Sequence, residues 1–351
     1  MKKLQTKPRA FKQWSILAIA ICGLMFLCLQ SCQNTEALRS PNVDSSLQDL
    51  TLKVTQVPEP IQPIPLEIVL NPQKVELGKR LFHDTSLSGD GKVACATCHK
   101  LSMGGVDRKM KSIGMNNVMT ERNTSTVFNS GFNFKQGWDG KAATLEEVVE
   151  LVINDPTMMS NSWTAIVQHL KQETNYEQAF RQVYDNGITS ENIKDAIATF
   201  TRSLYTPNSR FDRYLRGQQD AISDEEKAGY KLFKDYGCAS CHQGVNVGGN
   251  LFQKFGVTEN YFKVHGNPSK PDLGRSNVTG SEADRYVFKV PSLRNIALTE
   301  PYLHNGWAKT LAEAIDIMAD YQLGRVLPKK DSDSIVQFLN TLTGEYQGKP
   351  L

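Results

Sequence analysis

The chain has 351 residues, of which 40% are hydrophobic and 22% charged, and this length suggests about two domains. The mixture excludes a collagen, a coiled coil, a disordered tail and a polytopic membrane protein, because its one long apolar run lies at the N-terminus. Five of the 40 basic residues and no acidic residue precede position 31, which leaves 35 basic against 37 acidic side chains. This near-neutral balance gives no support to nucleic-acid binding.

Residues 1–31 have the order of a secretory signal peptide, since a basic start is followed by an apolar stretch from Trp14 to Leu29. The four residues that end at Cys32 then resemble a bacterial lipobox, which implies cleavage before Cys32 and acylation of its thiol. A single transmembrane anchor is the alternative, although about 16 apolar residues are short for a spanning helix. We expect an exported lipoprotein at the periplasmic face of the outer membrane or at the cell surface.

Residues 32–65 are polar and then rich in proline, with no sustained helical period. Such a composition is typical of a semi-extended tether. We expect this segment to hold a soluble body away from the membrane.

The body contains an internal repeat, because residues 77–84 (LGKRLFHD) match residues 228–235 (AGYKLFKD). Asn71 followed by proline predicts the start of the first repeated helix, and Ser223 with Glu226 forms a capping box that predicts the start of the second. Further helices are predicted at residues 143–154, 162–173, 191–205, 311–319 and 331–342.

Each repeat precedes a Cys-x-x-Cys-His motif, at residues 95–99 and 238–242. Cysteine pairs in an exported protein usually predict disulfides, but a histidine directly after Cys-x-x-Cys is the attachment signal of c-type haem. Two thiols on one helical turn can reach the vinyl groups of a porphyrin while the adjacent imidazole turns to the iron. The predicted haem ligands are Cys95, Cys98 and His99 for the first haem and Cys238, Cys241 and His242 for the second. A zinc or redox Cys-x-x-Cys is the alternative, and the presence of two such motifs disfavours it.

These signals predict a mainly α fold of two cytochrome c-like haem domains with long irregular loops, since strand signals are few and short. The N-terminal haem domain is placed at residues 66–210 and the C-terminal haem domain at residues 211–351. Sequence spacing alone leaves the sixth ligand of each iron open among the other histidines and methionines of the body.

The sequence resembles the bacterial di-haem cytochrome c peroxidases, with the methylamine-dehydrogenase maturation enzymes as related proteins, from about residue 66 to residue 346. The resemblance rests on both haem motifs and on further segments in the family's order. These segments are LGKRLF (77–82), RNTSTVFN (122–129), WDGKA (138–142), FDRYL (211–215) and VPSLRNIALTEPYLHNG (290–306).

In that family the N-terminal haem meets hydrogen peroxide, while the C-terminal haem takes electrons from a small donor protein, a cytochrome c or a cupredoxin. The resemblance implies that Met318 is the sixth ligand of the second iron, where a thioether raises the reduction potential. It also implies that Trp138 lies between the haems. The side chain of Asn123 and the backbone carbonyls of Thr299 and Pro301 match an inter-domain calcium site. A homodimer is a further expectation, because relatives commonly dimerise.

The sequence departs from the family pattern near the first haem. Met115 occupies a loop that often carries a displaceable histidine, and Val148 stands where a distal glutamine is common. Met158 occupies the position of the distal glutamate. A thioether can neither accept the first proton of peroxide nor deliver it to the leaving oxygen.

Three hypotheses about function follow. In the first, the chain is a cytochrome-c-peroxidase-type oxidoreductase in which Glu146, Glu147 or Asp155 replaces the missing acid–base group. In the second, Met115 or Met158 ligates the first iron, which leaves a non-peroxidatic two-haem electron carrier or redox sensor. In the third, the chain is an oxidase of a protein or organic substrate, which the methionine at the second iron disfavours because the maturation enzymes carry tyrosine there. Retention of the family scaffold favours the first.

Overall fold

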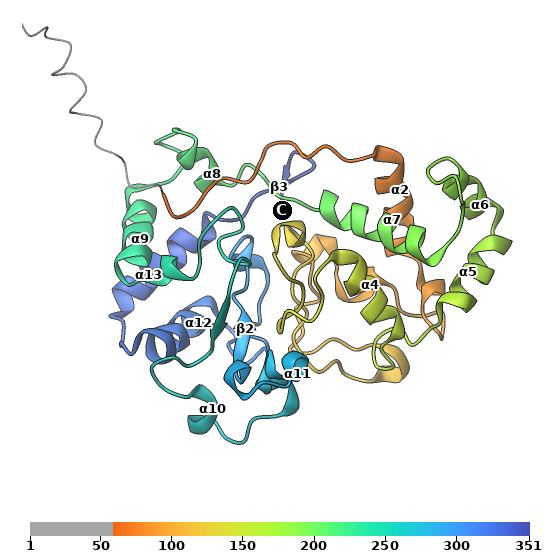
Figure 1. Cartoon of the computed structure of the whole chain (residues 1–351). Coiled ribbons are helices and arrows are strands. Elements are labelled where there is room, and N and C mark those ends of the chain that lie inside the picture. Colours follow the sequence, from red (N-terminus) through yellow and green to blue (C-terminus); the bar gives the residue numbers. More distant parts are fainter. Residues whose placement is uncertain (1–58) are drawn as a thin grey trace, which may run out of the picture. The chain divides into compact units, whose positions relative to one another are not determined.

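Helices and long loops make up almost all of residues 59–351, which are the residues that the computed structural model describes (Figure 1). The few strands in this range form two small antiparallel sheets, β1 with β2 and β3 with β4. The predicted mainly α fold is therefore confirmed. The predicted signal peptide, Cys32 and most of the predicted tether lie outside the described residues. Within residues 59–351, no helix is both long enough and apolar enough to cross a membrane.

The first region, residues 66–210, contains six α-helices, and one of them is part of the first cysteine motif. They are α2 (Pro72–Phe82), α3 (Cys95–Cys98), α4 (Leu145–Asn154), α5 (Trp163–Gln172), α6 (Thr174–Arg181) and α7 (Ser190–Ser203). The second region, residues 211–351, contains the remaining helices and all four strands. They are α8 (Arg210–Leu215), α9 (Asp224–Asp235), α10 (Tyr261–Val264), α11 (Ser276–Thr279), α12 (Leu311–Met318), α13 (Lys329–Asn340), β1 (Phe252–Lys254), β2 (Val287–Lys289), β3 (Glu345–Tyr346) and β4 (Lys349–Pro350).

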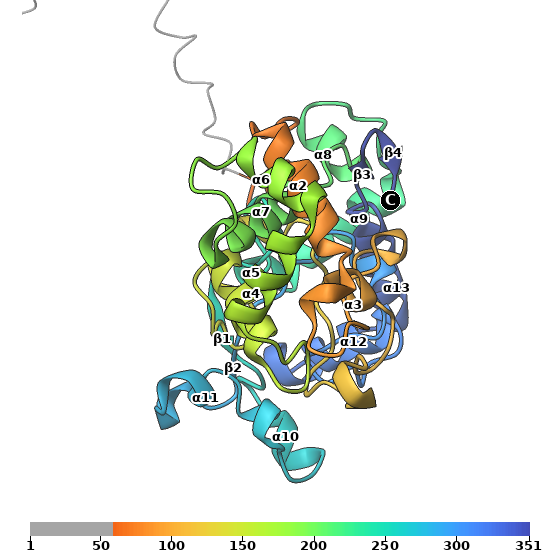
Figure 2. The ribbon, with the colours of Figure 1, turned by 90° about the vertical axis from the view of Figure 1, so that its right-hand side faces the viewer.

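The long helices begin and end within two residues of their predicted limits. Asn71 caps α2, because its side chain accepts hydrogen bonds from the N–H groups of Gln73 (2.9 Å) and Lys74 (3.1 Å). Ser223 and Glu226 form the predicted capping box at the start of α9. The short helices α6, α8, α10 and α11 are absent from the prediction, and Figure 2 shows that α10 and α11 project from the rest of the chain.

Each cysteine motif is backed by its own pair of packed helices. In the first region α2 packs on α7, and in the second α9 packs on α13. Both crossings need a glycine: a Cβ on Gly78 would lie 1.9 Å from the carbonyl oxygen of Ala196, and one on Gly229 would lie 2.0 Å from that of Ser334. The repeat seen in the sequence is therefore a repeat of helix packing as well.

The last residues of the predicted tether are packed against the second region. Ile61 and Ile64 are buried, and the N–H of Gly244 donates to the carbonyl of Pro60 at 2.8 Å. The guanidinium of Arg294 donates to the carbonyl of Gln62 at 2.9 Å and forms a fully buried ion pair with Asp212 at 2.7 Å. Figure 1 shows this segment passing from beside α9 across to α2. Residues 59–65 therefore connect the two regions as ordered chain.

A buried amide cluster joins the loops of the two regions. Asn129 and Asn295 both have left-handed backbone conformations, with φ of 60° and 59°, and both donate their side-chain N–H to the hydroxyl of Thr206, at 2.8 and 3.0 Å. The N–H of Thr206 donates back to Asn129 at 2.9 Å. These buried polar groups form hydrogen bonds with one another and not with water. They therefore fix the relative positions of the loops that contain Asn129, Thr206 and Asn295.

Candidate functional site

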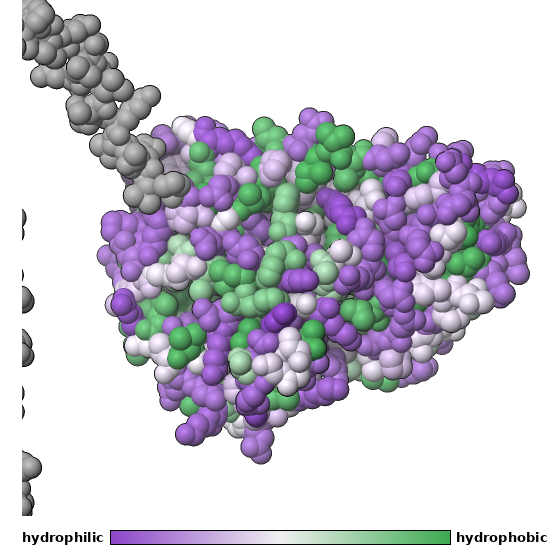
Figure 3. Space-filling view, in the orientation of Figure 1, coloured by the Kyte–Doolittle hydropathy of each residue, from purple (hydrophilic) through white to green (hydrophobic). Residues whose placement is uncertain are grey.

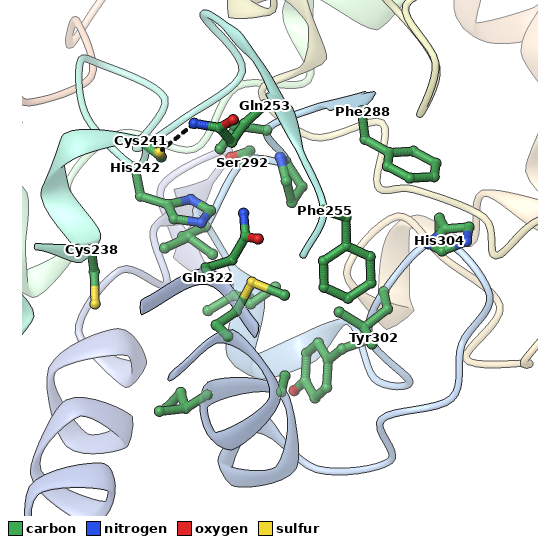
Figure 4. A pocket seen from close by; sticks show the side chains of 18 of the residues that line it. Cys238, Cys241, His242, Gln253, Phe255, Phe288, Ser292, Tyr302, His304 and Gln322 are labelled. Carbon is green, nitrogen blue, oxygen red and sulfur yellow. Dashed lines mark hydrogen bonds between the residues drawn. The ribbon is translucent and has the colours of Figure 1, made fainter. Parts of the chain in front are cut away.

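The second cysteine motif faces a cavity of about 370 Å³. Cys238, Cys241 and His242 line one part of it, and Met318 from the last turn of α12 lines another. Figure 4 shows the imidazole of His242 and the ring of Phe255 in this cavity, and the rest of the wall is mainly apolar. In the view of Figure 3, apolar side chains gather over the part of the molecule that holds α12 and β2. A mostly apolar cavity with a few convergent polar groups is typical of a cofactor site.

The imidazole of His242 is held close to the backbone behind it. A Cβ on Gly248, whose φ is 117°, would lie 2.4 Å from the carbonyl oxygen of Pro291 and 3.3 Å from Nδ1 of His242, so only glycine fits there. Burial lowers the pKa of His242 to about 4. The imidazole is therefore neutral near pH 7 and keeps a nitrogen lone pair for a metal.

The first motif forms a single helical turn, α3, with His99 directly after it. Nδ1 of His99 lies 3.2 Å from the carbonyl oxygen of Gly105, so Nδ1 carries the proton and Nε2 is left for a metal. Burial lowers the pKa of His99 and raises that of Cys95 to about 12, which keeps the imidazole and the thiol neutral.

The residues of both motifs fit a covalently attached haem. All four cysteines are free thiols, so no disulfide among the described residues competes with attachment. Each motif offers two thiols and one neutral imidazole, which is the donor set that c-type haem requires. Burial raises the pKa of Cys238 to about 11, so its thiol, like that of Cys95, is protonated near pH 7.

Lys289 is a buried cation that lines the same cavity as His242. Within residues 59–351 its side chain forms no ion pair or hydrogen bond, and burial lowers its pKa to about 8. A buried ammonium without a partner is costly, so this position favours an anionic group in the cavity. The sequence prediction missed Lys289, because a lysine between two apolar residues carries no sign of its burial.

Trp138 lies on the wall of this cavity, at the meeting of the two regions. Its indole Nε1–H donates to the carbonyl of Asn123 at 2.9 Å, and its own carbonyl accepts the N–H of Lys289 at 2.9 Å. The ring therefore cannot turn freely, and its backbone is attached to the strand that carries Lys289.

A buried His304–Asp272 pair lies beside Trp138, and of the two only His304 was considered from the sequence, as one of the histidines left open as a sixth ligand. The rings of His304 and Trp138 meet edge to face with centroids 6.3 Å apart, and Nε2 of His304 lies 2.7 Å from Asp272. Burial opposes ionisation of Asp272, but the hydrogen bonds from His304 and Ser269 outweigh it and lower its pKa to about 2. A sequence separation of 32 residues leaves no local signal for this pair.

The three predicted calcium ligands, Asn123, Thr299 and Pro301, all line the cavity. The side-chain N–H of Asn123 donates to the carbonyl of Lys109 at 3.0 Å, which turns the amide so that its oxygen accepts no hydrogen bond from residues 59–351. Within that range, no cluster of three or more His, Cys, Asp or Glu side chains could hold a metal ion. Any cation here would rely on neutral oxygen ligands.

Near the first motif the structure brings Met115 and Met158 together. The N–H of Met115 donates to the carbonyl of Met158 at 3.2 Å. The side chain of Met115 is buried in the apolar core of the first region, whereas Met158 is half-buried. Sequence reasoning named both residues but had no means of placing them side by side.

The carboxylates that could replace the distal glutamate have other partners. Glu146 forms an ion pair with Arg202 at 2.8 Å, and although burial opposes this, Arg202 lowers the pKa of Glu146. Glu147 accepts the N–H of Ala143 at 2.6 Å as part of the cap of α4. Asp155 accepts both the N–H and the hydroxyl of Thr157, at 2.7 and 2.6 Å. Of the three, only Asp155 lies on the same turn as Met158, whose N–H donates to its backbone carbonyl at 3.1 Å.

Comparison with known proteins identifies the family. Residues 72–220 match the family model described as di-haem cytochrome c peroxidase. The chain is 43% identical over 288 residues to the cytochrome c551 peroxidase of Nitrosomonas europaea, covering 82% of this chain and 85% of that protein. This chain belongs to the di-haem cytochrome c peroxidase family. The resemblance on which the site prediction rests is therefore confirmed.

Other members of the family show how widely it varies. The chain is 45% identical to the cytochrome c peroxidase Ccp of Escherichia coli over 82% of its own length, but it spans only 62% of that relative. It is 33% identical to the methylamine utilization protein MauG of Methylorubrum extorquens, covering 85% of this chain and 82% of that protein. Among solved structures, a MauG-like protein associated with microbial copper homeostasis superposes with a TM-score of 0.72 at 28% identity, covering 83% of this chain and 95% of that one.

Proposed function

We propose that this chain is an oxidoreductase that reduces hydrogen peroxide to water with electrons from a small cytochrome or cupredoxin. One observation carries the proposal: a methionine lines the cavity of the second motif, while the equivalent residue of the first region is a valine. Thr310 and Thr144 cap α12 and α4, and Met318 and Val152 each lie eight residues after their cap. A site closed by two protein ligands suits electron transfer, and a site with an open position suits peroxide.

The second region would hold its haem through Cys238, Cys241, His242 and Met318. When bound, the two haems supply redox-active irons, one for reducing peroxide and one for storing an electron. The thioether of Met318 would raise the reduction potential of the second iron. Lys289 would pair with a carboxylate of that haem, which supplies the anion that its buried ammonium lacks. The fixed indole of Trp138 would lie on the route of the electron between the two sites.

The first region would hold its haem through Cys95, Cys98 and His99. Reduction of peroxide to two waters consumes two electrons and two protons, so a group near the peroxide must move protons. Met158 has no proton to give. Asp155 is the carboxylate best situated for this task, because it accepts the hydroxyl of Thr157, the residue next to Met158. Glu146 is held as a carboxylate by Arg202, and Glu147 is engaged in the helix cap.

A second function is favoured by the position of Met115. Met115 is buried and its backbone bonds to that of Met158, and in this second proposal one of the two thioethers would ligate the iron held by His99. The chain would then be a two-haem electron carrier or redox sensor with both irons closed.

Ligand binding and turnover decide between these functions. In the holoprotein, cyanide should shift the spectrum of one haem only, and peroxide should be consumed with a reduced cytochrome c as donor. Asp155→Asn should lower this turnover while leaving cyanide binding intact. A spectrum that cyanide leaves unchanged in both redox states would reject the peroxidase and favour the carrier.

The proposal includes a calcium site between the two regions. We propose that Asn123, Thr299 and Pro301 bind Ca²⁺ through oxygen atoms, which the unbonded amide oxygen of Asn123 supports. Removal of calcium with EGTA should then change the spectrum of the protein, and added Ca²⁺ should restore it.

We further propose that the chain is exported, anchored through lipid on Cys32, and homodimeric. Labelling with a fatty-acid probe that Cys32→Ala abolishes would test the anchor.

A further inference from the structure

The helix that carries Met318 changes its hydrogen-bonding pattern directly after this residue. α12 ends at Met318, and the chain continues as a π-turn, Ala319–Leu323, closed by Gly324 with φ of 62°. A single turn of π-helix such as this one is rare and recurs at functional sites. The orientation of Met318 therefore depends on what holds this turn.

The side chain of Gln322 fastens the π-turn to the loop that follows β1. Its amide oxygen accepts the backbone N–H groups of Gly256 and Val257, at 2.6 and 3.1 Å. Its amide nitrogen donates to the carbonyl of Lys254 at 3.0 Å. The three bonds use both acceptor sites and one of the two donors of the amide, so the side chain is fixed on three sides. Figure 4 shows Gln322 between His242 and Phe255.

The loop returns a second set of bonds to the same turn. The N–H and the hydroxyl of Thr258 both donate to the carbonyl of Tyr321, at 3.1 and 2.9 Å. Gly256 has φ of 81°, and a Cβ there would lie 2.5 Å from the carbonyl oxygen of Glu259, so only glycine lets the loop present its N–H to Gln322. The π-turn and residues 254–258 thus form one closed hydrogen-bonded unit.

We propose that Gln322 is a positioning residue for the sixth ligand of the second haem iron. Met318 and Gln322 line the same cavity, and fixing Gln322 fixes the backbone from which the thioether of Met318 extends. A thioether is a weak ligand to ferric iron, so its occupancy depends on being held in place beforehand. Gln322 acts through Met318 and makes no bond to the iron. The inference rests on the proposed function, in which Met318 is that ligand.

The test is Gln322→Leu in the holoprotein, with bound haem quantified separately. Loss of three hydrogen bonds should raise the population without methionine ligation roughly tenfold or more. The expected result is a weaker methionine-to-iron charge-transfer band in the ferric protein and a lower reduction potential of the second haem. Imidazole should gain access to the second iron, and the first haem should be unaffected.

Two further variants separate positioning from general loss of structure. Gln322→Glu keeps an acceptor for the N–H groups of Gly256 and Val257, so it should restore most of the band. Gln337→Leu is the matched control, because this exposed glutamine of α13 does not line the cavity and its side chain makes no hydrogen bond to the π-turn. It should leave the band unchanged.

Each outcome has a distinct meaning. A Gln322→Leu protein with the wild-type band and potential would overturn the inference while leaving the proposed function standing. A Met318→Leu protein with the wild-type band would overturn the ligand assignment of the proposed function, and the inference with it. If Gln322→Leu fails to retain haem, Gln322→Asn decides, because it keeps an amide but its shorter side chain should lose the bonds to Lys254, Gly256 and Val257. A wild-type band in that variant would again overturn the inference.

Discussion

The two regions share one scaffold but bury different side chains at equivalent points. Thr144 and Thr310 accept the N–H groups of Glu147 (3.2 Å) and Glu313 (3.1 Å), so α4 and α12 begin in the same way. The residue eight positions later packs into the apolar core of the first region, as Val152, but lines the cavity of the second, as Met318. The two helices therefore present a thioether at only one of the two sites.

The two regions also differ at the residues that precede Asn129 and Asn295, the asparagines that both bond to Thr206. Phe128 precedes Asn129 and packs edge to face on Tyr346 with ring centroids 5.2 Å apart. Arg294 precedes Asn295, is equally buried, and pairs with Asp212. The comparison shows that equivalent positions share a backbone geometry but bury different side chains.

The largest effect is expected at the ion pair that only the second region contains. Asp212→Ala would leave the guanidinium of Arg294 buried without its counter-charge, which should lower the free energy of unfolding by about 3–5 kcal/mol. Urea unfolding of the holoprotein measures this. Asp333→Ala, which removes the partner of the exposed Lys329, is the control and should cost about 0.5 kcal/mol or less. Equal losses in the two variants would refute the importance of the buried pair.

The next largest effect concerns Met158, which stands where the family resemblance implies a distal glutamate. Met158→Glu should raise peroxide turnover by a factor on the order of 10², because it returns a carboxylate to the position where the family carries one. Steady-state turnover with a reduced cytochrome donor is the measurement. Met119→Glu adds the same charge at an exposed position and should have no effect. No gain from Met158→Glu in a protein with both haems attached would show that the missing glutamate does not limit turnover.

Transfer of the ligand from one region to the other gives a smaller effect. Val152→Met places a thioether where Met318 stands in the second region, and it should weaken cyanide binding at the first haem by about tenfold if the thioether occupies the iron for most of the time. A cyanide titration followed by absorbance tests this. Leu151→Met, on the same helix but outside the core, should bind cyanide normally. If Val152→Met binds cyanide as tightly as the wild-type protein, α4 and α12 do not place their side chains in equivalent positions.

The smallest effect tests the shared scaffold itself. Thr144→Ala and Thr310→Ala each remove a helix cap and should each lower the free energy of unfolding by about 1 kcal/mol. The two losses should be alike, but only Thr310→Ala should alter the spectrum of the second haem. A spectral change of the second haem in Thr144→Ala would contradict the assignment of ligands to separate regions.

The sequence predicted what depends on local signals. The caps at Asn71 and Ser223, the long helices and both haem motifs follow from residues close together in the chain, and the family resemblance directed attention to Met318 and Trp138. Lys289, Asp272 and Gln322 escaped prediction, because their roles come from contacts across the fold. Gln322, for example, bonds to a loop 65 and 66 residues away.

The sequence also did not predict that the end of the tether, residues 59–65, is packed, because its contacts are with distant residues. Ile61 and Ile64 stand among prolines, a composition that gives no local sign of burial. Asp212 accepts the N–H of Ile64 and Arg294 donates to the carbonyl of Gln62, and these partners lie 148 and 232 residues further along the chain. Sequence reasoning likewise named Met115 and Met158 as separate candidates, whereas the structure places their backbones in contact.

The central claim is that the two irons differ in the ligand opposite histidine. Low-temperature electron paramagnetic resonance combined with near-infrared magnetic circular dichroism of the fully oxidised protein reads both sets of axial ligands at once. The account predicts one haem with histidine and methionine and a second haem with histidine but no methionine, which alone responds to cyanide. Two haems with the same axial ligands, or a methionine signal that survives in Met318→Leu, would contradict it.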